Sequence, residues 1–224
     1  MSLTKKELTE YHLSVQTKEI SEMVRRTHPF ETSIAGIKIT VLPNVYPGGT
    51  DSELMCEVLQ VSAKDEVLDL CTGTGVIALR ATQLGAKSVV GVDLNPNAIK
   101  NAKLNQLKLG LGNIQFLEGS LFEPVIGQVF DVITMNPPYT DKKPANKTEI
   151  CFWDENNQTT VDFFRQFRNY LKPNGRVFLG WADFSSVKLV EELAKENRAT
   201  LKLVNSRKTP SGLATFLVYQ IIPA

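Results

Sequence analysis

Cysteine and histidine are scarce in this chain of 224 residues. The three cysteines, Cys56, Cys71 and Cys151, are odd in number and form no CxxC pair, which argues against a disulfide framework or a zinc site. The two histidines, His12 and His28, have no partners at metal-ligand spacing. We therefore expect no metal site, and a protein that works in a reducing compartment.

Long apolar runs and an excess of charge of either sign are also lacking. No apolar run approaches the roughly 20 residues that cross a bilayer, and the first residues lack the apolar core of a signal peptide. The net charge of +1 and the pI of about 7.7 leave no global basic footprint for nucleic acid. These absences predict a protein with no membrane partner and a cytoplasmic location.

The first part of the chain predicts a helix followed by a β-hairpin. Residues 37–41 alternate between apolar and polar side chains, as in a half-buried strand. Residues 4–26 have the period of an amphipathic helix, with an apolar face formed by Leu8, Tyr11, Val15, Met23 and Val24. We therefore divide the chain into an N-terminal helix and hairpin extension, residues 1–45, and one larger domain, residues 46–224.

Strands and helices alternate from residue 64 onward, which predicts an α/β fold with a doubly wound, mostly parallel, seven-stranded sheet covered on both faces. The last two strands have no helix between them and a turn containing Pro210 and Gly212, so they should form an antiparallel hairpin. Strands are predicted at 66–71, 88–93, 114–118, 129–135, 175–182, 200–206 and 213–221, and helices at 75–84, 96–109, 159–171 and 185–197. The last turns of the third helix carry a predicted core cluster, Phe163, Phe164 and Phe167.

The turn after the first of these strands contains Gly73 and Gly75, and Asp93 ends the second strand. Glycine lets the backbone approach a ligand closely, and the following helix presents free N–H groups at its start. A carboxylate at position 93 would accept hydrogen bonds from both ribose hydroxyls. The pattern predicts a bound nucleoside but leaves its identity open, because Gly73-x-Gly75-x-x-Ala78 also fits the dinucleotide pattern GxGxxG/A.

A nicotinamide-dependent oxidoreductase is therefore an alternative function. Tyr139 and Lys143 even have the Tyr-x3-Lys spacing of short-chain dehydrogenases. Such a pair converges only on a helix, however, and Pro137 and Pro138 immediately before Tyr139 disfavour one. We therefore favour another reading of this segment.

The stretch Asn136-Pro137-Pro138-Tyr139 follows a predicted buried strand and suits chemistry on a planar NH2 group. The nitrogen of an amide or an aminopurine is a poor nucleophile because its lone pair is delocalised. Two acceptors, the Asn136 side-chain oxygen and the Pro137 carbonyl, would hold the two N–H bonds, and Tyr139 would stack on the planar group. Proline fixes φ and so fixes the direction of the carbonyl.

The two motifs together, residues 67–75 and 136–139, resemble the cofactor and catalytic motifs of class I S-adenosylmethionine-dependent methyltransferases. The chain is most similar to the release-factor glutamine methyltransferases and to their small-domain relatives that methylate exocyclic amines of nucleic-acid bases. The resemblance covers about residues 30–222 and implies a Rossmann-like fold, S-adenosyl-L-methionine as cofactor and N-methyl transfer.

The resemblance also implies roles for individual residues. The loop from Cys71 to Gly75 would wrap the methionine part of the cofactor, Asp93 would bind ribose, Leu121 would lie against adenine, and Asn136 would touch both cofactor and acceptor. Cys71 departs from the family pattern, which usually has glycine there, and we interpret it as a buried small residue. The segment Thr50-Asp51-Ser52-Glu53, which also has the character of a helix start, resembles an upstream family segment near the methionine end. The implied set is catalytic residues Asn136, Pro137, Pro138 and Tyr139, with cofactor-binding residues Asp69, Cys71, Thr72, Gly73, Thr74, Gly75, Asp93, Leu121 and Asn136.

The favoured acceptor is a glutamine side chain of a release-factor-like protein, and the alternative is the exocyclic amine of adenine or guanine in RNA or DNA. Only some 30 residues stand where the family has a helical substrate-binding domain. Residues 140–158 are predicted to form a polar loop that has few apolar anchors and is mobile without substrate. Phe152 and Trp153 in this loop would either stack on the substrate or pin the loop to the core.

Overall fold

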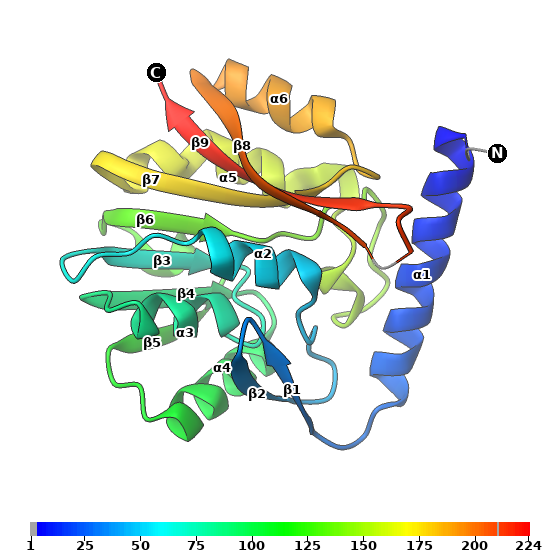
Figure 1. Cartoon of the computed structure of the whole chain (residues 1–224), viewed down its shortest axis with the longest axis horizontal. Helices are drawn as coiled ribbons and strands as arrows, with labels where there is room; N and C mark the ends of the chain where they lie inside the picture. The colour runs from blue at the N-terminus through cyan, green and yellow to red at the C-terminus, as the bar shows by residue number, and fades with distance from the viewer. Residues whose placement is uncertain (1–3, 210) are drawn as a thin grey trace.

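A seven-stranded sheet forms the centre of the computed structural model, which describes residues 4–209 and 211–224 (Figure 1). Its strands lie in the order β5-β4-β3-β6-β7-β9-β8; the first five are parallel neighbours, and β9 runs antiparallel to both of its neighbours, β7 and β8. The predicted α/β class and C-terminal hairpin are therefore confirmed, although Pro210 lies outside the described residues. The strands are β3 (Glu66–Leu70), β4 (Ser88–Asp93), β5 (Ile114–Glu118), β6 (Phe130–Met135), β7 (Leu171–Ala182), β8 (Ala199–Lys208) and β9 (Thr215–Pro223).

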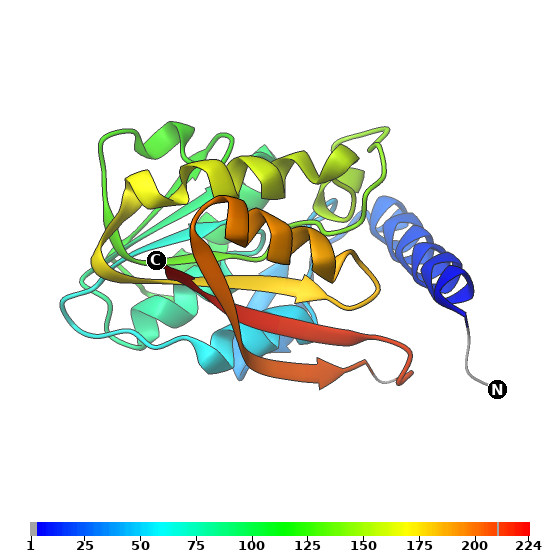
Figure 2. The same ribbon diagram turned by 90° about the horizontal axis from the view of Figure 1, so that it is seen from above.

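Helices cover both faces of this sheet, as the alternation predicts (Figure 2). One apolar core lies under α2 (Thr50–Val58), α3 (Val76–Gln83) and α4 (Pro96–Leu109). The other lies under α5 (Gln158–Gln166), α6 (Val187–Glu196) and two short 3-10 turns, Glu123–Val125 and Phe167–Tyr170. The central parallel strands can be almost wholly apolar because both of their faces are buried. The predicted core cluster is confirmed, since Phe163, Phe164 and Phe167 are each at most 1% exposed.

β7 begins four residues before its predicted start, and the helix preceding it is shorter than predicted. Phe130 pairs with Leu171 and Val132 pairs with Arg176, so the ladder is interrupted by a bulge. This bulge contains Pro173, which cannot donate to a ladder, and Asn174, whose φ is +62°. A proline and a turn-forming asparagine normally end a strand, so the sequence pattern does not predict the first part of β7.

α1 (Lys5–Arg25) stands across the carboxyl ends of the parallel strands (Figure 1). A capping box begins it, in which Thr4 and Glu7 bond each other's backbone N–H groups. Its buried stripe matches the predicted one only in part: Met23 is buried as predicted, Val24 is 55% exposed, and His12, Gln16 and Ile20 are buried as well. Within the described residues, no helix is long and apolar enough to cross a membrane.

β1 (Phe30–Ile34) and β2 (Ile37–Val41) pair as a separate antiparallel hairpin. Its apolar residues Ile37, Ile39 and Val41 lie in the same core as α2 and α3. The predicted domain boundary near residue 45 stays a prediction. The hairpin precedes that boundary, but its apolar side chains pack in the core of the larger domain that follows it.

Two asparagines on α4 bind the edge of the hairpin as a neighbouring strand would. Asn105 accepts a hydrogen bond from the Thr40 N–H (2.8 Å) and donates to the Thr40 and Thr74 carbonyls (3.0 Å each). Asn101 accepts from the Leu42 N–H and donates to the Thr40 carbonyl, each at 2.7 Å. Both side chains are at most 1% exposed, so these bonds satisfy backbone groups that water does not reach.

We expect Asn105→Ala to lower the free energy of unfolding by roughly 2–4 kcal/mol, because the Thr40 N–H and the Thr74 carbonyl would be left buried without partners. Urea unfolding measures this change. The control is Lys103→Ala at an exposed position of the same helix, which should shift the free energy by less than about 0.5 kcal/mol. Equal stability of the two variants would contradict the bridging role of Asn105.

Candidate active site

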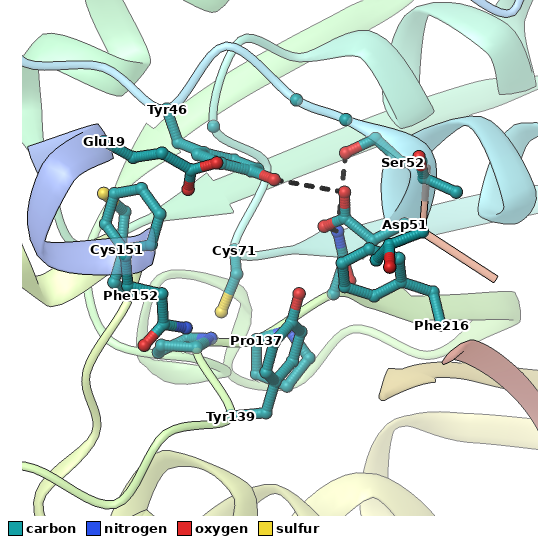
Figure 3. A pocket seen from close by; sticks show the side chains of 18 of the residues that line it. Glu19, Tyr46, Asp51, Ser52, Cys71, Pro137, Tyr139, Cys151, Phe152 and Phe216 are labelled. Atoms are coloured by element: carbon teal, nitrogen blue, oxygen red, sulfur yellow. Dashed lines mark hydrogen bonds between the residues drawn. The ribbon is translucent and has the colours of Figure 1, made fainter. Parts of the chain in front are cut away.

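Two adjoining cavities open beyond the carboxyl ends of β3, β4 and β6, and Figure 3 shows the larger of the two. The larger, about 360 Å³, is lined by α1, the segment leading into α2, the turn after β3 and the segment after β6. The smaller, about 110 Å³, is lined by the end of β4 and the segment after β5. Their shared lining residues are Tyr46, Cys71, Gly73, Asn136, Pro138 and Cys151, so the two predicted motifs meet where the cavities join.

The turn after β3 requires backbone conformations that most residues avoid. Gly75 has a φ of +82°, and a side chain there would place its Cβ 2.9 Å from the Ala102 Cβ. Cys71, where the resembled family has glycine, also adopts a left-handed φ of +58°. It is half-buried and lines both cavities, so its interpretation as a buried small residue holds only in part. Burial of the thiol raises the pKa of Cys71 well above its usual value, so the thiol stays protonated and unreactive.

Asp69, predicted as a cofactor ligand, lies beneath this turn rather than at either cavity. Its carboxylate is fully buried and accepts hydrogen bonds from the hydroxyls of Thr72 (2.6 Å) and Thr134 (2.7 Å). Burial raises the pKa of Asp69 to about 6, against which these two hydrogen bonds act. The geometry gives Asp69 a role in shaping the turn, while Thr72 and Thr74 line the larger cavity.

Asp93 and Leu121 come together in the smaller cavity, where the family resemblance implies ribose and adenine. The Asp93 carboxylate accepts hydrogen bonds from the backbone N–H groups of Gly73 and Asn95, both at 2.8 Å. Burial raises the pKa of Asp93 above its ordinary value. The position of a Cβ on Gly73 has no atom within 4 Å, so the backbone there is open to close approach by a ligand.

Asn136 is held in place by the start of α2. Its Nδ2 donates to the Asp51 carboxylate (2.7 Å), and its Oδ1 is buried without a hydrogen-bond partner within the described structure. Pro137, Pro138 and Tyr139 line the larger cavity, as predicted for an acceptor site. The Tyr139 ring meets Trp181 and Phe184 edge to face, with centroids 5.9 and 5.7 Å apart.

Residues that were not predicted as site residues complete the larger cavity. Asp51 is 4% exposed and also accepts a hydrogen bond from the Tyr46 hydroxyl at 3.2 Å, and burial raises the pKa of Asp51. Glu19 of α1 and the aromatic Phe216 of β9 line the same cavity (Figure 3). Only Asp51 had a sequence signal, the resemblance of residues 50–53 to an upstream family segment. Tyr46, Glu19 and Phe216 lie outside both motifs.

The loop 140–158 is anchored by its aromatic residues. Phe152 and Trp153 are each 6% exposed and pack with Ile20 and Met23 of α1, and Thr140 forms an isolated bridge with Trp153. The prediction that this loop has few apolar anchors is therefore wrong, because α1 supplies their partners. The anchoring interpretation fits both aromatic residues, although Phe152 also lines the larger cavity. Mobility of the loop stays a prediction.

Comparison with known proteins identifies the family. The sequence profile described as methyltransferase small domain matches residues 36–207, and the chain belongs to this family. A Methanocaldococcus jannaschii protein, provisionally named protein N5-glutamine methyltransferase, is 41% identical over 64% of this chain and 75% of its own length. The release factor glutamine methyltransferase of Shewanella oneidensis is 32% identical over 68% of this chain, which spans only 59% of that enzyme.

Solved structures share the fold at lower identity. The Thermus thermophilus 16S rRNA N2 G1207 methyltransferase, in complex with AdoMet and guanosine, superposes with a TM-score of 0.65 and 23% identity, covering 86% of this chain and 50% of the other. The ribosomal protein L11 methylase of Lactobacillus delbrueckii gives 0.60 and 21%, covering 82% and 84%. The protein is thus an S-adenosylmethionine-dependent methyltransferase, which sets aside the oxidoreductase alternative.

The residues of the two cavities fit this cofactor. A carboxylate at the end of β4 suits ribose hydroxyls, and the carboxylate of Asp51 in the larger cavity suits the positively charged methionine end. The open space at Gly73 lies where the two cavities meet. Among residues 4–209 and 211–224, no group of three or more His, Cys, Asp or Glu residues is placed to hold a metal ion.

Asp69→Asn should flatten the pH dependence of stability. The pKa of Asp69 rises from an ordinary 3.8 to about 6 on folding, so its favourable contribution is complete below about pH 4 and is lost as the pH rises through 6. The wild-type free energy of unfolding should therefore fall by roughly 2 kcal/mol more than that of the variant between pH 4 and 7. Urea unfolding across this range measures the difference, and parallel curves would contradict the buried state of Asp69.

Gly180→Ala should impair turnover through Asn136. A Cβ at residue 180 would lie 2.3 Å from the Asn136 Oδ1, so the amide must move. We expect turnover to fall ~10- to 100-fold, as for other small displacements of a reacting geometry, while affinity for S-adenosylmethionine changes less than about threefold. The control is Gly112→Ala, where a Cβ meets nothing within 4 Å. If Gly180→Ala turned over at the rate of this control, the position of the Asn136 amide would not matter for turnover.

Proposed function

We propose that this methyltransferase transfers a methyl group to the side-chain amide nitrogen of a glutamine in a protein. The observation that carries the proposal is the lining of the larger cavity. Around Asn136 and Pro137 it contains two carboxylates, those of Glu19 and Asp51, together with aromatic rings, and no lysine or arginine among its described lining residues. Such a site accepts an uncharged NH2 donor and disfavours an anion.

Asp51 prepares Asn136 to receive that donor. A carboxylate only accepts hydrogen bonds, so the Asn136 amide must present Nδ2 to Asp51 and its oxygen to the other side. The oxygen lies beside Gly180, buried without a partner, which is a costly state; an incoming N–H group that drew the amide toward the cavity would relieve it. The Pro137 carbonyl, fixed in direction by its ring, would accept the second N–H of the amide.

These two acceptors would act on the nitrogen rather than on the methyl donor. When both N–H bonds are held, the nitrogen is oriented for attack and loses less freedom on reaching the transition state. S-adenosylmethionine supplies the activated methyl group, and the nitrogen becomes acidic once methylated, so no strong base is required. Tyr139, with Phe216 beside it at a ring distance of 6.2 Å, would enclose the flat amide.

The charge of the site disfavours the alternative acceptor, a base in RNA or DNA. Phosphate contacts by lysine and arginine dominate nucleic-acid affinity. In the groove that adjoins the larger cavity, Lys142 lies over the Trp153 ring with its Nζ 3.5 Å from the ring centroid, and it is thus engaged within the protein. The two most similar relatives named above are both glutamine methyltransferases by name, which supports a protein acceptor.

Methyl transfer from labelled S-adenosylmethionine into a fractionated lysate tests the proposal. The label should become sensitive to protease and resistant to nuclease, and mass spectrometry should place one methyl group on a glutamine. Label that is released by nuclease and found on a base would overturn the protein acceptor.

With the acceptor in hand, Asn136→Ala should lower turnover ~10²- to 10³-fold, as for the loss of one preorganised polar contact. Calorimetric affinity for S-adenosylmethionine should fall far less. The control is Asn156→Ala, an exposed asparagine of the neighbouring loop that lines neither cavity and should keep the parental rate. A parental rate for Asn136→Ala would remove Asn136 from the chemistry.

A further inference from the structure

Helix α1 forms a wall of the acceptor cavity. Five of its residues line the larger cavity: Tyr11, His12, Val15, Gln16 and Glu19. The helix is fastened on both sides of the Asn136–Tyr139 segment, because Gln16 accepts a hydrogen bond from the Thr140 hydroxyl (3.0 Å) and the His12 ring stacks on Phe184 at 4.2 Å. Residues of α1 thus hold a fixed position beside the reacting groups.

Glu19 is the acidic residue that α1 contributes to this wall. Figure 3 shows it beside Tyr46, with its carboxylate directed into the cavity. The side chain is solvent-exposed, whereas Asp51 is 4% exposed, so Glu19 stands at the entrance and Asp51 at the base. Partial burial and the negative charges of Asp51 and Glu22 raise the pKa of Glu19.

The Glu19 charge has no cationic partner in the part of the chain that the structure describes. No described lysine or arginine lines the cavity, and no ion pair there involves Glu19. His12 also lines this cavity, and its ring nitrogen Nε2 lies within hydrogen-bond distance of the Leu213 carbonyl at 3.1 Å. An uncompensated carboxylate at the entrance of a cavity attracts positive charge and repels negative charge on whatever enters.

We propose that Glu19 is a specificity-determining residue: it selects acceptor segments that carry a lysine or arginine beside the methylated glutamine and rejects segments with an acidic neighbour. The inference rests on the proposed function, since it takes a glutamine side chain to occupy the cavity beside Asn136. The methylated amide reaches the base of the cavity, and the neighbouring side chains of the same segment remain at its entrance, where Glu19 lies. Recognition of this kind acts on acceptor binding and leaves the chemistry at Asn136 unchanged.

The expected effect is that of one partly exposed ion pair. A pair of this kind changes an affinity by about two- to fivefold, and reversal of one charge should change the preference by about five- to 25-fold. The effect should appear in KM for the acceptor and not in kcat, and it should shrink as salt is raised.

The experiment uses a degenerate library of short synthetic peptides, each with one central glutamine flanked by serine, lysine or aspartate. Wild-type enzyme, Glu19→Gln and Glu19→Lys are compared, and the matched control is Glu10→Gln, an exposed acid of the same helix that does not line the cavity. Wild type and control should prefer lysine-flanked peptides, Glu19→Gln should lose the preference, and Glu19→Lys should favour aspartate. Calorimetric affinity for S-adenosylmethionine should stay within about twofold in every variant.

The outcomes separate this inference from the proposed function. If wild type methylates glutamine peptides but Glu19→Lys keeps the same flank preference, or if Glu10→Gln loses it equally, only the role of Glu19 is overturned. A matching loss of S-adenosylmethionine affinity in Glu19→Gln would place Glu19 in the cofactor site and overturn it as well. If no glutamine peptide is methylated and the label enters RNA or DNA, both proposals fall.

Discussion

The buried carboxylate of Asp69 joins the end of the central strand β3 to the turn and the strand beside it. Asp69 is the penultimate residue of β3, and its carboxylate accepts hydrogen bonds from Thr134 of the adjacent β6 and from Thr72 of the turn that follows β3. A fully buried carboxylate is costly, and the two hydroxyls offset part of that cost only if strand and turn keep their positions. The cofactor turn and the segment that starts at Asn136 are thereby held relative to each other by one side chain.

A second hydrogen bond, between Asp51 and Asn136, fixes the orientation of a side chain in the larger cavity. Asp51 lies at the start of α2 and accepts a hydrogen bond from the Nδ2 of Asn136. This bond directs the amide oxygen away from the carboxylate. The absence of a side chain at Gly180 leaves the space that this oxygen occupies. The geometry of the Asn136 amide therefore depends on a helix start, a strand end and a glycine on the neighbouring strand β7.

The N-terminal helix and the loop 140–158 depend on each other. Ile20 and Met23 pack on Phe152 and Trp153 and help to bury them, and the same contact keeps α1 beside the cavity. The small sheet formed by β1 and β2 is joined to α4 by buried asparagines rather than by a strand ladder. The N-terminal helix and the loop thus form one side of the larger cavity, although they lie outside both sequence motifs.

The sequence by itself determined the sheet and the position of its binding edge. Apolar runs such as residues 88–93 and helical periods such as 96–109 are local patterns, and the structure has both elements at those bounds. Because parallel strands end on one edge, placing Gly73, Asp93 and Asn136 at strand ends was enough to predict that they meet.

Tertiary structure decided the features that local sequence patterns do not encode. Three such features each depend on a partner distant in sequence: the start of β7 before Pro173, the buried stripe of α1, and the anchoring of Trp153. The partnership of Asp51 with Asn136, 85 residues away, and the approach of Glu19 to the same cavity exist only once the chain is folded, because side-chain contacts between separate elements leave no periodic trace in the sequence.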